Sequence, residues 1–78
     1  MVDLKETLHN IAVAIVDSPD EVVVVCNETE NNINLTLSVA PDDMGMVIGR
    51  HGRIAKAIRT VIKAAAVNSG KKVNVDIR

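Results

Sequence analysis

The sequence predicts a two-layer α+β domain, in which helices cover one face of a three-stranded sheet and the elements follow in the order α-β-β-α-α-β. Two observations predict this fold. Apolar residues recur at helical spacing in two long segments, and they alternate with polar residues, as in half-buried strands, between and after those segments. A chain of 78 residues has room for one core, so we expect a single domain over residues 1–78.

The first helix is predicted over residues 3–17. Asp3 and Glu6 have the spacing of a helix N-terminus, and Pro19 ends the helix because the residue before a proline avoids the helical conformation. An apolar stripe gives this helix its buried face: Leu4, Leu8, Ile11 and Ile15.

Two strands are predicted next, over residues 21–27 and 33–39. The first is a run of β-branched residues that includes Cys26, which we interpret as a small core residue. In the second, apolar residues alternate strictly with polar ones, as in a strand with one buried face. The polar residues 28–32 form a short turn, so the two strands should make an antiparallel hairpin.

The rest of the chain is predicted to form a short helix, a long helix and a final strand. The short helix covers residues 44–48, and the preceding pair Asp42-Asp43 is interpreted as helix-capping. The long helix covers residues 53–67 and stops before Gly70, a residue that favours a helix end. Residues 71–78 alternate again and form the third strand.

The charges are divided between the two halves of the chain, although the net charge is only −1. Residues 1–43 carry nine acids and a single base, Lys5, whereas residues 44–78 carry eight bases and a single acid, Asp76. Such a basic segment offers a local positive field to a polyanion. The chain has no aromatic residue, which argues against RNA-binding folds that stack bases on aromatic rings.

Several classes of protein are disfavoured by composition. A single cysteine cannot form an intramolecular disulfide or a cysteine-based zinc finger. The aliphatic runs are far shorter than the ~20 residues of a membrane span, and the first residues lack the pattern of a signal peptide. We therefore expect a soluble, cytoplasmic protein that does not associate with membranes.

The functional prediction depends on the loop Gly49-Arg50-His51-Gly52 between the short and the long helix. Two glycines at this spacing are common by chance, so the surroundings matter. Glycines allow a phosphate backbone to approach the main chain, and the N-terminus of the next helix offers unpaired N–H groups and partial positive charge. The loop is therefore predicted to clamp the sugar–phosphate backbone of single-stranded RNA.

The segment Val47-Ile48-Gly49-Arg50-His51-Gly52-Arg53-Ile54 and the element order together resemble a type II (prokaryotic) KH domain, over the whole chain. In that family the loop clamps about four nucleotides. A lone KH domain of this length is similar to the bacterial KhpA/YlqC-like family. The resemblance implies a cytoplasmic RNA chaperone that forms a homodimer, or a heterodimer with a KhpB/Jag-type KH protein. It also implies a link to cell elongation and envelope homeostasis.

The expected RNA-binding residues are Ile48, Gly49, Arg50, His51, Gly52, Arg53, Ile54 and Lys56. By the resemblance, residues 49–52 are the clamp, Ile48 and Ile54 are apolar flanks of a base groove, and the strand 33–39 is the opposite wall. Many KH loops carry two basic residues; because an imidazole is mostly neutral at pH 7, we expect His51 to soften the affinity. Farther along the helix, phosphate contact is expected to fade.

Two other functions differ in how well the sequence supports them. A protein-interaction adaptor, in which the helix 53–67 serves dimerisation and RNA binding is minor, is suggested by the small core and the apolar-rich helix. A nucleotide-binding enzyme is disfavoured because the loop lacks the G-K-[ST] of a P-loop and no nucleophile–base pair is visible. We expect no catalysis, cofactor, metal site or small-molecule substrate.

Overall fold

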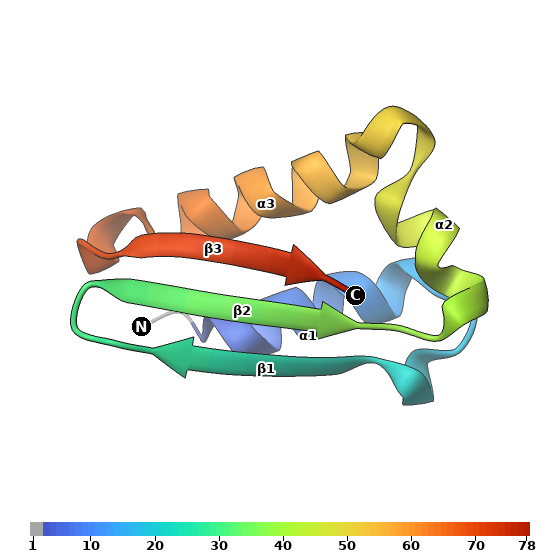
Figure 1. The fold of residues 1–78 in the computed structure, drawn as a ribbon, viewed down its shortest axis with the longest axis horizontal. Coiled ribbons are helices and arrows are strands. Elements are labelled where there is room, and N and C mark those ends of the chain that lie inside the picture. The colour runs from blue at the N-terminus through green and yellow to red at the C-terminus, as the bar shows by residue number, and fades with distance from the viewer. Residues whose placement is uncertain (1–2) are drawn as a thin grey trace.

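The computed structural model describes residues 3–78. Three α-helices and three strands follow one another in the predicted order, which confirms the fold class (Figure 1). They are α1 (Leu4–Ile15), β1 (Val23–Glu28), β2 (Asn32–Ser38), α2 (Met44–Ile48), α3 (Arg53–Ala65) and β3 (Lys72–Ile77). No helix among the described residues combines the length and the apolar character needed to cross a membrane.

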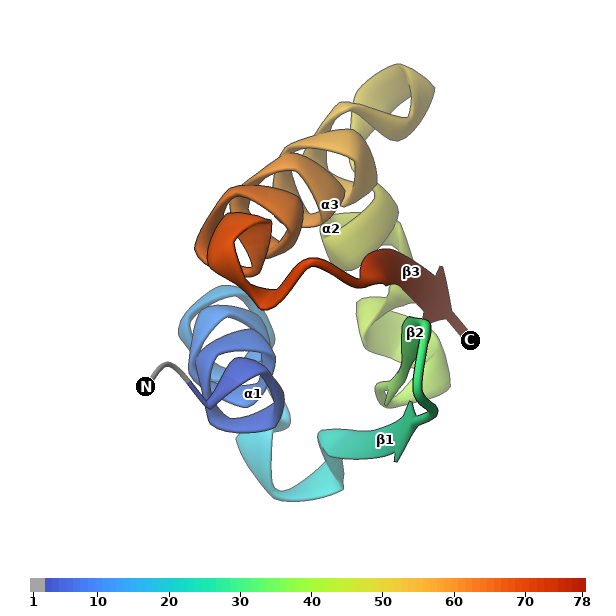
Figure 2. The same cartoon turned by 90° about the vertical axis from the view of Figure 1, so that its left-hand side faces the viewer.

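The three strands form one mixed sheet in the order β1-β2-β3. β1 and β2 are antiparallel, as the hairpin prediction required, and β3 lies parallel to β2 with Leu35 opposite Val75. Figure 2 shows the helices on one side of the sheet, so its other face is open. On that open face Asn74 Nδ2 donates a hydrogen bond of 2.9 Å to Asn34 Oδ1.

The core lies between the sheet and the helices. The alternation predicted for residues 33–39 is confirmed, because Ile33, Leu35 and Leu37 are buried while the intervening polar residues are not. The stripe predicted for α1 packs on the core, with Leu8 fully buried. The stripe predicted for α3 was Ile54, Ile58, Val61, Ile62 and Ala65, and it is only partly correct, because Ile54 and Val61 are exposed while Ala55 is buried. The short α2 contributes one buried side chain, Val47. The fully buried large side chains are Leu8, Leu35, Leu37, Val47 and Ile62.

Two helix ends differ from the prediction by two residues, for local reasons. α1 ends at Ile15, because Val16 is already extended, and a 3-10 turn over Pro19–Glu21 then delays β1 to Val23. Proline favours such a turn because its φ is fixed. α3 ends at Ala65 and continues as a 3-10 turn before Gly70, which adopts the left-handed conformation expected of a helix stop.

Asp43 corrects the interpretation of the acidic pair as helix caps. The side chain of Asp43 makes no capping bond to α2, and none caps the turn at Pro41–Asp43 either. Instead its carboxylate, only 2% exposed, accepts hydrogen bonds from the backbone N–H groups of Ser18 (3.0 Å) and Asp17 (3.4 Å). Because those groups follow α1, Asp43 ties the end of α1 to the start of α2.

Candidate nucleic-acid interface

The loop between α2 and α3 is a single tight turn, visible in Figure 1 as the segment that projects beyond the sheet. α2 ends with a backbone hydrogen bond of 2.8 Å from Gly49 N to Gly45 O, and Gly52 N then donates to Gly49 O at 3.2 Å. Both glycines have a φ of 73°, a region that side chains disfavour. The chain therefore reverses between the two helices as the sequence predicted.

The two glycines serve different purposes. A Cβ atom on Gly49 would lie 2.3 Å from Ile54 Cγ1, so the missing side chain makes room for a side chain of the same molecule. A Cβ atom on Gly52 would meet nothing within 4 Å. Open approach to the main chain, which was expected at both glycines, is thus available at Gly52, whereas Gly49 packs against α3.

The two residues between the glycines present their side chains to solvent. Arg50 and His51 are both exposed, and His51 has a left-handed backbone with φ 58° and ψ 25°. Histidine is among the residues that visit this conformation more often than most, but it costs energy for any residue other than glycine. The turn holds this costly conformation, and the loop remains exposed at both positions.

The start of α3 is open and positively charged. Its N-cap residue, Gly52, offers no side-chain hydrogen bond, so no side chain caps the start of this 13-residue helix. The N–H of Arg53 donates to the carbonyl of Arg50 in the preceding 3-10 turn, so any open N–H groups are those that follow Arg53. Arg53 and Lys56 are exposed within the first turns, and α3 contains no acidic residue. A helix N-terminus without a side-chain cap and with adjacent bases attracts anions.

Ile48 and Ile54, the two apolar residues that flank the loop, differ in their exposure to solvent. Ile48, the last residue of α2, is half-buried. Ile54 is 39% exposed, although part of it packs against Gly49. The structure therefore brings together the eight residues predicted as a site, all of which belong to the end of α2, the loop or the first turns of α3.

The prediction that residues 33–39 form the opposite wall of a base groove was wrong. β2 is the central strand, and its backbone is paired on both sides, with β1 and with β3, so it cannot offer backbone groups to a base. The strand beside α3 is the edge strand β3 (Figures 1 and 2). The similar alternation of the two strands gave no local signal of which one would lie at the edge.

The outer edge of β3 carries backbone groups that do not pair with β2. Lys72 N donates to the carbonyl of Asn31, just before β2, and Arg78 N donates to the carbonyl of Leu37 within β2. Backbone groups alternate in direction along a strand, so those of residues 73, 75 and 77 point away from β2. The carbonyl of Val75 confirms this direction, since it accepts a hydrogen bond of 3.2 Å from Arg59 Nε of α3. The sequence did not predict this contact, because a phosphate contact was expected to fade along the helix toward Arg59 and no partner in the sheet was expected for it.

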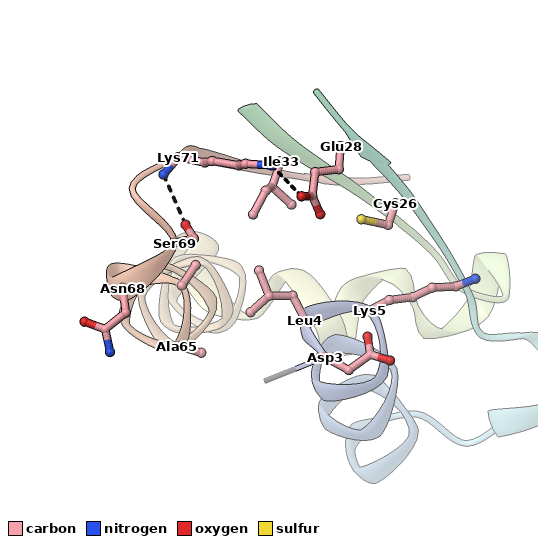
Figure 3. Close-up of a pocket in the computed structure, with 11 residues that line it drawn as sticks. Asp3, Leu4, Lys5, Cys26, Glu28, Ile33, Ala65, Asn68, Ser69 and Lys71 are labelled. Carbon is pink, nitrogen blue, oxygen red and sulfur yellow. Dashed lines mark hydrogen bonds and ion pairs between the residues drawn. The ribbon is translucent and has the colours of Figure 1, made fainter. Parts of the chain in front are cut away.

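A cavity at the C-terminal end of α3 is shown in Figure 3, at the opposite end of this helix from the loop. It has a volume of about 810 Å³ and lies among the start of α1, the β1–β2 hairpin and the residues after α3. Cys26 lines it, half-buried and unpaired, and the ion pair between Lys71 and Glu28 borders it. None of the eight predicted site residues contributes to this cavity.

Comparisons with known proteins agree with this architecture. A family model described as the KhpA/KhpB KH domain matches residues 5–77. The RNA-binding protein KhpA of Clostridium acetobutylicum is 60% identical over 74 residues, covering 95% of this chain and 99% of the relative. The KhpA of Clostridium perfringens is 55% identical, with the same coverage, and that of Listeria monocytogenes is 42% identical over 95% of this chain and 97% of the relative.

Among solved structures, the chain is similar to Era, crystallised with MgGDPNP and nucleotides 1506–1542 of 16S ribosomal RNA. The TM-score is 0.70 at 17% sequence identity, over 95% of this chain and 28% of the Era chain. At this identity the likeness concerns the fold, and it places the same topology in a larger protein. The coverage by the family model and the identity to full-length relatives show that this chain belongs to the KhpA/KhpB KH-domain family.

Proposed function

We propose that this protein binds single-stranded RNA in the cytoplasm, without catalysis, by clamping the sugar–phosphate backbone on the loop 49–52. The observation that carries the proposal is the uncapped start of α3, which follows an exposed, base-bearing turn with an open approach at Gly52. The names of the relatives, RNA-binding protein KhpA, support the same conclusion.

The proposed contacts divide between backbone and base. Arg50, Arg53 and Lys56 supply charge to the phosphates, and the N–H groups that follow Arg53 in the first turn of α3 donate to phosphate oxygens. Ile48 and Ile54 provide an aliphatic surface for the bases, which suits a chain without aromatic residues. The edge of β3, in place of the central strand, offers backbone donors and acceptors to base edges.

The clamp is tested by the double variant Arg50→Asp/His51→Asp. Reversing charge at the turn places carboxylates against phosphates, so we expect affinity for a labelled single-stranded RNA to fall at least about tenfold. Fluorescence anisotropy at several salt concentrations measures this loss. The slope of log affinity against log salt should also flatten by about 0.7 for each phosphate contact removed.

A matched control variant shows whether a loss of RNA affinity comes from the loop itself or from the change in net charge. The variant Lys5→Asp/Lys72→Asp changes two exposed bases outside the loop and alters the net charge at least as much. It should retain most of the affinity, and circular dichroism should show both variants folded. Normal RNA binding by the loop variant would refute the clamp.

The family resemblance extends the proposal to the role of RNA chaperone and to cell elongation and envelope homeostasis. A clamp that grips backbone holds many sequences, which is what an RNA chaperone requires. The loop variant and its control test this extension, since only the loop variant should fail to speed the refolding of a misfolded RNA. In cells, only the loop variant should change cell length.

A second candidate function, self-association or pairing with another KH protein, is favoured by the outer face of α3. Four exposed apolar residues follow one another there at spacings of three, four and three: Ile54, Ala57, Val61 and Ala64. We call these residues the α3 seam. This spacing is that of a helix–helix contact, and three of the four residues directly follow a base, namely Arg53, Lys56 or Lys63. The pairing would add to RNA binding, because the seam and the loop meet only at Ile54.

A further inference from the structure

Arg59 differs from the other bases of α3 because it is anchored to the sheet. Its Nε donates a hydrogen bond of 3.2 Å to the carbonyl of Val75, on the outer edge of β3. Among residues 3–78, no comparable side-chain bond fixes Arg53, Lys56 or Lys63. A base that only solubilises a helix, or only attracts phosphate, does not need such an anchor.

The anchor leaves most of the guanidinium available. Arginine has five N–H donors in one plane, and the bond to Val75 uses one of them. In the described part of the chain the ion pairs join Lys71 to Glu28 and Arg78 to Asp76, so no carboxylate neutralises Arg59. Its residue is exposed. The charged guanidinium of Arg59, a planar fork of N–H donors, is therefore held beside the outer edge of β3.

The position along α3 is beyond the phosphates that the loop would hold. Arg59 follows Gly52 by seven residues, which corresponds to about 10 Å along a helix axis. Beside it, β3 presents the backbone groups of alternate residues on its outer edge, with the carbonyl of Val75 already occupied. A nucleotide whose backbone continues from the clamp would thus place its base against the remaining N–H groups of this fork, which the bond to Val75 holds at the edge of β3.

We infer that Arg59 is a specificity-determining residue that selects bases with two neighbouring hydrogen-bond acceptors. Guanine presents O6 and N7 as neighbouring acceptors, and cytosine presents O2 and N3, whereas N1 and N7 of adenine and both carbonyls of uracil each lie next to a donor. A fork that only donates pairs with the first two and meets a donor on the others. This inference rests on the proposed RNA binding, and it adds a preference that the backbone clamp does not supply.

The test compares a uridine decamer with decamers in which one central base is guanine, cytosine or adenine. The wild-type protein should bind the guanine or the cytosine oligonucleotide about tenfold more tightly than the adenine one. Comparison of the guanine oligonucleotide with the cytosine oligonucleotide shows which of the two bases Arg59 prefers. Arg59→Lys keeps the charge but loses the planar fork, so it should lose this discrimination while its affinity for the uridine decamer stays within about threefold.

A purely structural role for Arg59 gives a different result, since the lysine variant would then weaken all four oligonucleotides equally. Lys63→Met, which removes an unanchored base from the same helix, should leave discrimination unchanged. Equal binding of all decamers by the wild type, or unchanged discrimination in Arg59→Lys, overturns the inference. No binding of any decamer overturns the proposed function itself.

A measurement on the wild-type protein covers the case in which Arg59→Lys does not fold. The Nε–Hε resonance of Arg59 should shift in two-dimensional NMR spectra on addition of the guanine or the cytosine decamer. With the uridine decamer it should stay close to its unbound position. A shift of the same size with every decamer contradicts base reading by this side chain.

Discussion

At the scale of single residues, Gly49 determines whether the loop and α3 can approach one another. Its φ of 73° and the 2.3 Å separation between a virtual Cβ and Ile54 Cγ1 are two independent reasons for glycine. Gly52 shares the φ but has open space around it. A substitution at Gly52 therefore measures the cost of the left-handed backbone alone, whereas the same substitution at Gly49 adds the cost of steric overlap with Ile54.

We predict that Gly49→Ala lowers the free energy of unfolding by about 3 kcal/mol, from the left-handed backbone together with overlap against Ile54. Gly52→Ala should lose only the backbone part, about 1–2 kcal/mol. Urea denaturation followed by circular dichroism measures both values. Equal losses in the two variants would show that Ile54 moves away without cost.

Asp43 is the second residue whose surroundings matter more than its type. Its buried carboxylate accepts from two backbone N–H groups after α1, and Asp43→Ala would leave both without that partner. Each unsatisfied group costs about 1–3 kcal/mol, so we predict a loss of about 2–4 kcal/mol in unfolding free energy. Asp42→Ala, at an exposed neighbour, should change stability by less than about 0.5 kcal/mol, as chemical denaturation can check.

At the scale of elements, α3 has three separate surfaces. Its inner face buries Ala55, Ile58 and Ile62, its first turn carries the open N-terminus, and the α3 seam lies exposed. Helical spacing predicted the basic first turn and the burial of Ile58 and Ile62, but it also placed Ile54 and Val61 on the buried face, where the structure leaves both exposed. It could not show that the seam stays uncovered, since that depends on where β3 and α1 pack.

The seam gives a prediction about self-association. Val61 is 49% exposed, and Val61→Lys should dissociate a dimer by adding charge to a contact that basic residues already flank. Val25→Lys is the matched control, since Val25 is equally exposed but lies on the open face of the sheet. Sedimentation velocity at tens of micromolar should show a loss of dimer only for Val61→Lys.

Salt provides a second readout of the same contact. Because bases flank the seam on both copies, added salt should strengthen a homodimer by screening their repulsion. RNA binding should weaken with salt, because phosphate contacts release counterions. A monomeric wild type at all salt concentrations would rule out the homodimer and leave a heterodimer with an acidic partner surface.

The strands show why part of the site was beyond prediction. Residues 33–39 and 71–78 have the same alternation, so each is recognised as a half-buried strand, and the hairpin follows from the short turn between the first two. The position of β3 beside α3 is a non-local property of the sheet order. The partner of Arg59 depends on that order and was therefore invisible in the sequence.

At the scale of the whole molecule, local signals were sufficient for the fold class. The element order and the buried faces follow from periodicity, and the reversal at Gly49 from the glycine pair. Helix ends shifted by two residues where 3-10 turns replaced the last turn or preceded a strand. The hydrogen bond from Ser18 N to the Asp43 carboxylate joins residues 25 apart in sequence, and a contact of this kind can be identified only in the folded structure.

The parallel pairing of β2 with β3 has a consequence for the order of folding. Asn34 and Asn74, which meet across this pairing, are 40 residues apart, whereas the β1–β2 hairpin closes through a short turn. Closing the longer loop costs more chain entropy, so we expect the hairpin to form early and β3 to join late. The contact between the edge of β3 and Arg59 of α3 is then made in one of the last steps. An incompletely folded chain would carry the charge of the loop without the strand edge, and would hold RNA only as loosely as any basic segment does.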